Sequence, residues 1–427
     1  MAFPLLWRSG QSGIAAASPL AGQDNSTLLN LLVRKGVLSE QEADDLRSDL
    51  AKENTAALVS TSKSNNLERF ALTARFQAQF VDLDTDTGGS VPDPANVQHF
   101  FLRRIYFGAR AQFSANWSTY FNYDFAGSTF DQATITWRKS DLLTIDLGLR
   151  KAPFGYDEWS ISSGALKAIE RSTVTRFFVE SNNGRRLGAG SYHQGVFLGG
   201  AAHNGEFTYN VAVTNPERGE DAIAAVPGVG NATNNNFAYW ANAGYGVKFG
   251  DALLNSWKVG VSAGFLPDQG GPSNTNLGRG YDLSVYSAYA DIYYGPYSLV
   301  AEYYWAHNER GASLTRDSNP NGFWIQPSIR FGSLEPTFRF SYTDSDGRGI
   351  VPGDLVRSSP NPTGLTFDKI TEWYGGINWY PVGNDLRHEV KVQAGYIYAE
   401  STDRLSGAAT VSKLKTDGFR SQVQVNF

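Results

Sequence analysis

The sequence predicts an all-β fold: a closed, 16-stranded antiparallel transmembrane β-barrel with a short N-terminal helical segment. Segments in which apolar and polar residues alternate recur from Leu67 to the end of the chain. The connections between these segments are alternately short and long, and Tyr and Trp gather at the segment ends. Period-two alternation is typical of strands with one apolar face, and a rim of turns opposite a rim of loops is the anatomy of a transmembrane barrel.

We expect sixteen strands. They span roughly residues 67–82, 99–114, 117–127, 130–139, 142–152, 186–202, 205–215, 236–249, 255–266, 281–294, 297–308, 321–331, 335–344, 369–380, 387–400 and 417–427. Only the link between the third and fourth segments is short where a long one is due. The apolar face is thin and aromatic-tipped, as a lipid-facing surface would be, whereas the core of a soluble sandwich would carry larger and more varied aliphatic residues.

Composition excludes several classes of protein. No run approaches the roughly 18 apolar residues that a transmembrane helix needs. The chain has no cysteine, so disulfides, thiol catalysis and cysteine-based metal sites are excluded. A net charge of −5 argues against a nucleic-acid partner.

The first 66 residues differ from the rest of the chain. Residues 1–23 have the small residues of a cleaved leader but no proper apolar core, so they are read as a remnant or misassigned signal. Residues 24–66 are expected to form two short helices, broken near Gly36, and a polar linker. Ser39 and Glu42 have the spacing of a capping box. This segment is either a periplasmic tether or trimer-stabilising element, or an amphipathic lead-in without a specific role.

The backbone dictates what the barrel must look like in a membrane. Strands cross lipid only if every N–H and C=O is paired, which requires closure, and sixteen strands leave an aqueous lumen rather than a packed core. The last strand ends on Phe427, which resembles the C-terminal signal read by the barrel assembly machinery of bacterial outer membranes.

From Leu67 to Phe427 the chain resembles the phosphate-selective porin O and P family. The segments that carry the resemblance are Leu102–Gly108, Arg150–Gly155 leading through Glu158 to Glu170–Ser172, Arg185–Gly188, Gly295–Tyr297 with Ala301–Tyr303, and Gly376–Tyr380. The resemblance implies a homotrimeric porin of the bacterial outer membrane, in contact with lipid and lipopolysaccharide. It does not fix the solute, and phosphate itself is left open.

By the same resemblance, the long loop 153–185 folds into the barrel as its constriction. Its arginines either line the narrowest point and bind passing anions or hold the loop to the wall through ion pairs. Glu158 and Glu170 are expected to anchor the loop, and for Arg171 anchoring is the alternative. The basic residues proposed for the anion path are Arg75, Arg104, Arg110, Arg150, Arg171, Arg176, Arg185, Arg186 and Arg339.

Charges on the inward face support an anion preference. The basic residues there are Arg75, Arg104, Arg110, Arg138, Arg150, Lys248, Lys258, Arg330, Arg339, Lys391 and Arg420, and the acidic ones are Asp124, Asp146, Glu206, Asp291, Glu302, Glu372 and Glu389. This surplus of four positive charges would concentrate anions in a narrow bore, so we expect passive diffusion of small hydrophilic solutes with a moderate, salt-sensitive anion preference. Arg103 falls on the lipid side of this register, which requires a bulge or an interfacial position.

Two other functions remain as alternatives. An outer-membrane hydrolase would need a Ser/His pair on the outward face near one rim. Gly260–Gly264 matches the nucleophile-elbow pattern of hydrolases but lies inside an alternating strand. A soluble β-rich carbohydrate-binding or adhesion protein would pack its strands as two sheets around a dry core. No catalytic residue, metal site or cofactor is predicted, since the five histidines lack metal-ligand spacing.

Overall fold

The computed structural model describes residues 67–427 except 89–90, 181–184, 216–235, 250–254, 274–278, 361–363, 383–388 and 409. The chain divides into two compact units, Met1–Val59 and Ser60–Phe427, and every described residue belongs to the second. The predicted leader (1–23) and the predicted helical lead-in with its linker (24–66) lie outside the described residues.

Strands dominate the described residues. In chain order they are β1 Arg69–Asp86, β2 Val97–Gln112, β3 Trp117–Asp124, β4 Thr129–Ser140, β5 Leu143–Lys151, β6 Tyr192–Ala202, β7 Phe207–Thr214, β8 Ala238–Lys248, β9 Asn255–Leu266, β10 Leu283–Tyr294, β11 Tyr297–Ser313, β12 Arg316–Ser318, β13 Asn321–Ile329, β14 Leu334–Asp344, β15 Thr366–Trp379, β16 Val390–Ser406 and β17 Leu414–Asn426. The short helices are α3 Tyr156–Trp159, α4 Thr173–Phe178, η1 His203–Gly205 and α6 Pro352–Leu355. No helix among the described residues is long and apolar enough to span a bilayer.

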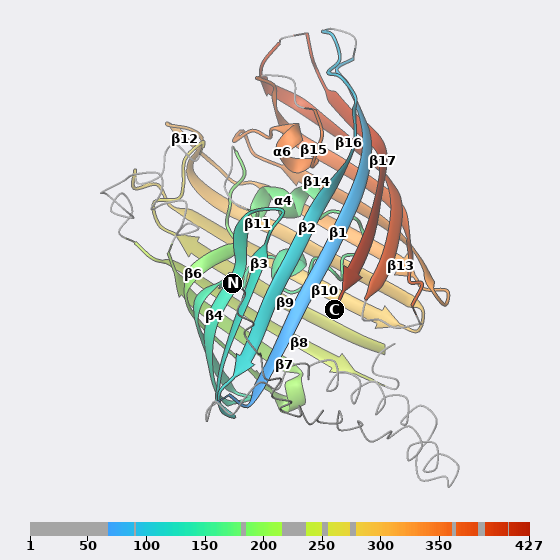
Figure 1. The fold of residues 1–427 in the computed structure, drawn as a ribbon. Helices are drawn as coiled ribbons and strands as arrows, with labels where there is room; N and C mark the ends of the chain where they lie inside the picture. Colours follow the sequence, from blue (N-terminus) through green and yellow to red (C-terminus); the bar gives the residue numbers. More distant parts are fainter. Residues whose placement is uncertain are drawn as a thin grey trace, which may run out of the picture. The chain divides into compact units, whose positions relative to one another are not determined.

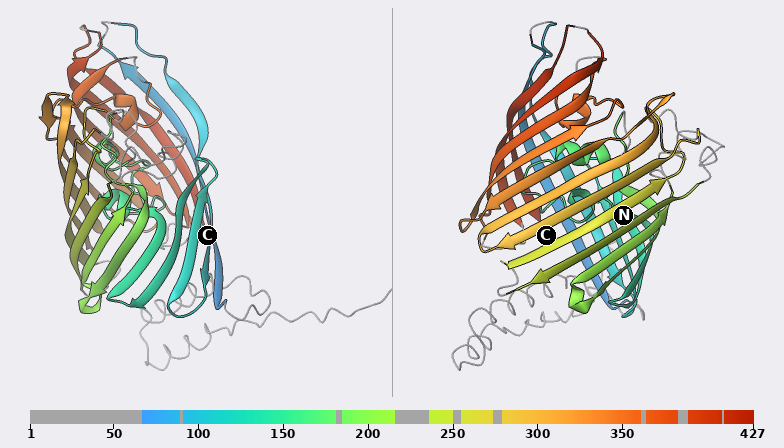
Figure 2. Two further views of the ribbon diagram at one scale, coloured as in Figure 1. Left: turned by 90° about the vertical axis from the view of Figure 1, so that its left-hand side faces the viewer. Right: turned by 180° about the vertical axis from the view of Figure 1, so that it is seen from behind.

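These strands form one sheet that closes on itself (Figures 1 and 2). Each barrel strand pairs antiparallel with its sequence neighbours, and β1 pairs with both β2 and β17. β12 has three residues and belongs to the loop between β11 and β13, which pair with each other directly. Setting β12 aside, sixteen of the seventeen strands described make the barrel wall, so the predicted fold is confirmed.

The two faces of the wall have opposite character. On β1, Leu72 and Phe76 point outward and are each 43% exposed. The inner face of the same strand carries the buried Gln77 and Gln79. Tryptophan and tyrosine are exposed at strand ends, as Trp117 and Trp379 illustrate. The soluble-sandwich alternative is therefore wrong, because the apolar face of this sheet is the outer one.

The nucleophile-elbow pattern lies within a strand, as predicted. Residues 260–264 belong to β9, and the Ser262 hydroxyl is 2.6 Å from that of Ser287 on β10. A nucleophile elbow requires a strand–turn–helix geometry, and Ser262 does not have this geometry.

One strand begins later than predicted. Alternation suggested that the sixth strand starts at residue 186, but β6 starts at Tyr192. Gly188 and Ser191 adopt left-handed φ values of 65° and 68°, which break an extended strand. On either side of Gly188, the backbone N–H groups of Leu187 and Ala189 donate to carbonyls of α4. Residues 152–191 consequently form one long loop, and Arg186 lies on it rather than on the wall.

A β-bulge resolves the conflict at Arg103. Gln77 pairs with Arg104 and Ala78 pairs with Leu102, so Arg103 is the extra residue opposite β1. A bulge of this kind can turn two successive side chains to one face. Leu102 points outward, Arg103 and Arg104 both point inward, and Phe107 points outward again. The bulge therefore delivers two adjacent guanidinium groups to the bore.

Phe427 completes the closure of the barrel. Its backbone N–H and C=O exchange hydrogen bonds with Ala74 of β1 at 3.0 and 2.8 Å, and its side chain is 74% exposed. We expect deletion of Phe427 to lower the amount of assembled barrel, because it removes two ladder hydrogen bonds and the terminal aromatic ring. Heat-modifiable mobility of outer-membrane fractions on gels measures this amount. Phe427→Tyr should assemble normally, and equal assembly of the deletion variant would refute the role of this residue.

Candidate pore constriction

The loop between β5 and β6 lies inside the barrel. Figures 1 and 2 show α4 within the ring of strands, well away from the outer surface. Its apolar side chains pack against the inner wall: Phe178 stacks on Tyr304 of β11 with ring centroids 5.2 Å apart, and Phe154 lies 6.4 Å from Trp240 of β8. Phe154, Phe177 and Phe178 are at most 1% exposed. The loop is thus a packed structural element of the bore.

Two carboxylates of the wall cap the loop's helices. Glu302 of β11 accepts hydrogen bonds from the backbone N–H groups of Tyr156 (2.7 Å) and Asp157 (3.1 Å) at the start of α3. Glu372 of β15 accepts one from Thr173 (2.7 Å) at the start of α4. The first N–H groups of a helix lack partners within the helix, so these contacts satisfy donors that would otherwise be buried unpaired. Sequence reasoning placed both residues in the bore but gave them no role.

Basic side chains of β14 and β16, the two neighbours of β15, bind the loop's carbonyl groups. Lys391 of β16 is fully buried and donates to the carbonyls of Gly164 (2.9 Å) and Leu166 (2.7 Å). Arg339 of β14 donates to the carbonyl of Glu170 (2.6 Å) and pairs with Glu372 at 2.5 Å. Both residues had been predicted to face the lumen. The structure places Arg339 under the loop, where its charge is paired with a carboxylate.

Glu170 is the point where the loop meets the bulge. Its carboxylate pairs with Arg103 at 2.6 Å and Arg357 at 3.2 Å, and it accepts a hydrogen bond from Gln79 at 3.1 Å. Burial by itself would raise the pKa of Glu170, but Arg103 and Arg357 hold it well below its ordinary value. These contacts are those of the anchoring role expected for Glu170.

The loop's own arginines are also paired. Arg171 is 3% exposed and pairs with Asp157 (2.9 Å) and Glu158, which in turn pairs with Lys151. Arg176 and Arg186 both pair with Glu180, at 2.8 and 2.9 Å. Arg185 donates to the carbonyl of Arg348. The contacts of Arg171, Arg176 and Arg186 are those of the alternative in which the loop's arginines hold it in place, because a charge enclosed by a carboxylate and by protein is not offered to a passing solute. Arg185 is half-buried and binds a carbonyl group instead of a carboxylate.

What the loop leaves open is an off-centre passage along β1–β6. One cavity of about 310 Å³ lies at the level of the loop, and a second of about 400 Å³ extends along β2–β5 toward the rim of short turns. Both are lined by Tyr120, Gln132 and Arg150, so they are neighbours along this wall. Of the nine basic residues proposed for the anion path, Arg75, Arg110 and Arg150 line these cavities. Arg104, Arg171, Arg176, Arg185, Arg186 and Arg339 line neither.

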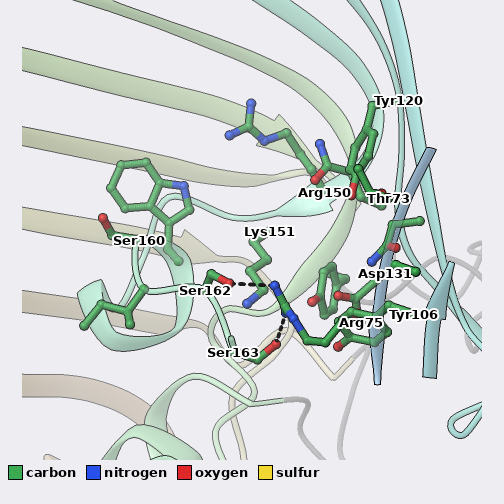
Figure 3. A pocket seen from close by; sticks show the side chains of 16 residues that line it. Thr73, Arg75, Tyr106, Tyr120, Asp131, Arg150, Lys151, Ser160, Ser162 and Ser163 are labelled. Atoms are coloured by element: carbon green, nitrogen blue, oxygen red, sulfur yellow. Dashed lines mark hydrogen bonds between the residues drawn. The ribbon is translucent and has the colours of Figure 1, made fainter. Parts of the chain in front are cut away.

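Arg75 of β1 is the best-placed cation in this passage. Its guanidinium donates to Asn426 (2.8 Å), Ser163 (2.6 Å) and Ser162 (3.0 Å), all neutral acceptors, as Figure 3 shows for the two serines. No carboxylate of the described residues forms an ion pair with it. Gly164 permits this approach, because a Cβ there would come within 2.8 Å of the guanidinium. Arg75 is therefore fixed in position by neutral acceptors, and its guanidinium remains without an ion pair among the described residues.

Sequence reasoning missed several residues of the passage. Lys151 and Asp131 line the cavity at the level of the loop, and Figure 3 shows both close to Arg75. Ser162 and Ser163 also line it. Lys151 follows Arg150 in a strand and so reads as outward-facing, but it is the last residue of β5 and turns inward to Glu158. Asp131 has the parity of the outward-facing Ile135, so alternation places it on the lipid side. It is the extra residue at a register shift between β3 and β4, where Asn122 pairs with Gln132 and Tyr123 pairs with Phe130, and this shift had no signal in the sequence.

The closed barrel, its apolar exterior and its wet bore narrowed by an inward loop define an outer-membrane channel of the porin class. The chain belongs to the phosphate-selective porin O and P family, whose model matches residues 70–427. Its place is accordingly the bacterial outer membrane.

Solved structures show the same fold at low sequence identity. The chain is similar to an anion-selective porin from Comamonas acidovorans (12% identity, 84% of this chain and 99% of that chain covered, TM-score 0.56). It is also similar to the outer membrane channel DcaP of Acinetobacter baumannii (11%, 87% and 100%, 0.52) and to Salmonella typhi OmpF in complex with daunomycin (11%, 85% and 100%, 0.51). No curated protein sequence matched the chain.

Removing Arg339 should destabilise the barrel. We expect Arg339→Met to cost about 3–5 kcal/mol in the free energy of unfolding, because it leaves Glu372 buried without its cation. Urea unfolding in detergent measures this. The matched control is Arg316→Met, since Arg316 is 61% exposed and its pair with Asp346 should contribute less than about 1 kcal/mol. Equal effects of the two substitutions would contradict the anchoring role.

Acid should release the loop. Burial alone would raise the pKa of Glu180, but Arg176, Arg357 and Arg186 lower it to about 2. A lowered pKa contributes stability that is complete above the unfolded value of 4.5 and is lost as pH falls toward 2. Glu170 acts in the same direction. We expect open-channel current noise to rise between pH 5 and 2, and a Glu170→Gln, Glu180→Gln variant to be noisy already at pH 7. A quiet double variant would contradict this assignment.

Proposed function

We propose that this porin is a passive diffusion channel for small hydrophilic solutes with a moderate preference for anions. One observation carries the proposal: the passage left open beside the loop is lined by more basic than acidic side chains. The basic residues are Arg75, Arg110, Arg138, Arg150 and Lys151, and the acidic ones are Asp131 and Asp146. The excess of positive charge in a narrow bore raises the local concentration of anions.

Several of these charges are paired, which supports a moderate rather than a strong preference for anions. Arg150 pairs with Asp146, and Lys151 pairs with Glu158 at 2.6 Å. Arg75 and Arg110 form no ion pair with any described residue, and Arg75 in addition lies beside two serine hydroxyl groups. Because Ser162 and Ser163 accept hydrogen bonds from Arg75, their own O–H groups are free to donate to an anion. A site with one unpaired guanidinium and two hydroxyl groups attracts anions but binds them weakly enough to release them, which conduction requires.

Phosphate is one candidate solute, because the family description names it. The cluster of Arg75, Ser162 and Ser163 presents hydrogen-bond donors to an oxyanion, as phosphate recognition needs. The same donors suit carboxylates and sulfate equally well, so this cluster supports oxyanions as a class.

The partners expected from the family resemblance remain predictions. We infer a homotrimer whose outer apolar band contacts lipid and lipopolysaccharide, and whose terminal Phe427 is read by the barrel assembly machinery. The exposed apolar face of the wall supports the lipid contact. Mass measurement of the detergent-extracted oligomer tests the trimer.

Neutralising Arg75 should weaken anion selectivity. We expect Arg75→Gln to shift the zero-current potential in a potassium chloride gradient toward the cation-selective direction, because it removes the unpaired charge but keeps hydrogen-bond donors. The shift should shrink as ionic strength rises, since screening shortens the reach of the charge. Planar-bilayer recording of the full chain measures both effects.

The matched control for this variant is Arg316→Gln, which removes the same charge from the exposed loop around β12. It should leave the zero-current potential unchanged. A wild-type channel that is not anion-selective would refute the proposal outright.

A further inference from the structure

The cavity at the level of the loop is as aromatic as it is basic. Of its sixteen lining residues, Tyr106, Tyr120, Trp159 and Tyr192 carry rings. Three of these rings already have a cation over one face: Arg75 over Tyr106 (5.5 Å), Arg110 over Tyr120 (5.2 Å) and Lys151 over Tyr192 (5.3 Å). The tyrosines therefore help to hold the basic residues in place.

Trp159 is different. It is the last residue of α3, and its side chain is half-buried where the neighbouring residues 152–158 are buried. Its indole makes no ring contact, cation–π contact or side-chain hydrogen bond with any residue that the structure describes. The loop buries Phe154, Phe177 and Phe178 almost completely, so its fold does not require an aromatic ring to remain in a wet passage. A ring left in contact with water is a surface on which another flat ring can stack.

The loop segment that follows combines this ring with the anion-binding hydroxyl groups. Residues 159–163 read Trp-Ser-Ile-Ser-Ser, and all five line the cavity. The apolar members are Trp159 and Ile161, and the last two serines are those held by Arg75. A cavity of about 310 Å³ is at the lower end of small-molecule sites. Inorganic anions would use only the hydroxyl groups and the guanidinium.

We propose that this cavity selects organic anions that carry a planar ring, with aromatic monocarboxylates as the solute class. The carboxylate is bound by Arg75 with the hydroxyl groups of Ser162 and Ser163, and the ring stacks on Trp159. The inference rests on the proposed anion channel and names its solute.

The test is competition in planar bilayers with the full chain. Benzoate, acetate and phosphate are each added to a chloride solution, and the concentration of each that halves the chloride current is measured. Benzoate should act at a concentration roughly three- to tenfold lower than acetate, the ratio expected from one aromatic contact, and lower than phosphate. Trp159→Ala should abolish the benzoate-to-acetate difference, and Trp159→Phe should retain part of it.

Both variants should keep the wild-type preference for chloride over potassium, which shows that the loop and Arg75 are still in place. Equal potency of benzoate and acetate in the wild type would overturn the inference, and so would an unchanged benzoate preference in Trp159→Ala. A wild-type channel without anion selectivity would instead overturn the proposed function, so the two failures are distinguishable.

Discussion

The hydrogen-bonded pairing of β1 with β17 is the interaction on which the rest of this molecule depends. In hydrocarbon no water is available for an unpaired backbone group, so an open sheet edge is not tolerated. From Arg75 opposite Asn426 to Asp86 opposite Lys415, the first and last strands pair without interruption. This closure fixes which face of every strand meets lipid, and it encloses a bore wide enough to contain the described residues of the loop, 152–180 and 185–191.

Inside that bore, charge works together with the apolar packing of the loop. The loop is held by carboxylates that cap helix N-termini and by buried cations that bind carbonyl groups, and one of each, Glu372 and Arg339, form an ion pair. Buried ion pairs of this kind contribute little net stability compared with apolar packing, but breaking one is costly because it leaves its partner uncompensated. Such a network suits a constriction, since it specifies one position for the loop.

The wall was predictable from the sequence because its signal is local. Alternation over eight or more residues identifies a strand and its two faces without knowledge of its partners, and even the anomaly at Arg103 pointed to the bulge that the structure contains. The loop was not predictable in the same way. Whether Arg171 or Arg176 faces a solute or a carboxylate depends on how an aperiodic segment folds against distant strands, and no spacing rule encodes those contacts.

Residues at the ends of strands and in contact with the loop were assigned no role for a related reason. Lys151 ends a strand, where alternation no longer dictates direction, and its partner Glu158 belongs to the aperiodic loop. Glu302 and Glu372 were placed on the correct face, but their capping role depends on helices that begin at Tyr156 and Thr173. Sequence reasoning therefore predicted the position of side chains on the wall more reliably than it predicted their roles.

The cavities lie to one side of the barrel, so the two sides of the wall have different neighbours. Residues of β1–β6 line the two cavities, and some of them, such as Arg75 and Arg103, also contact the loop. Residues of β11, β14 and β16 bind the loop without lining either cavity. Substitutions of cavity-lining residues that do not contact the loop, such as Arg110, can alter which solutes cross without disturbing the scaffold. Substitutions of Glu302, Arg339 or Lys391 instead alter whether the loop stays in place. Evolution can thus adapt such a channel to new nutrients by changing a few side chains on one flank, while the opposite flank preserves the architecture.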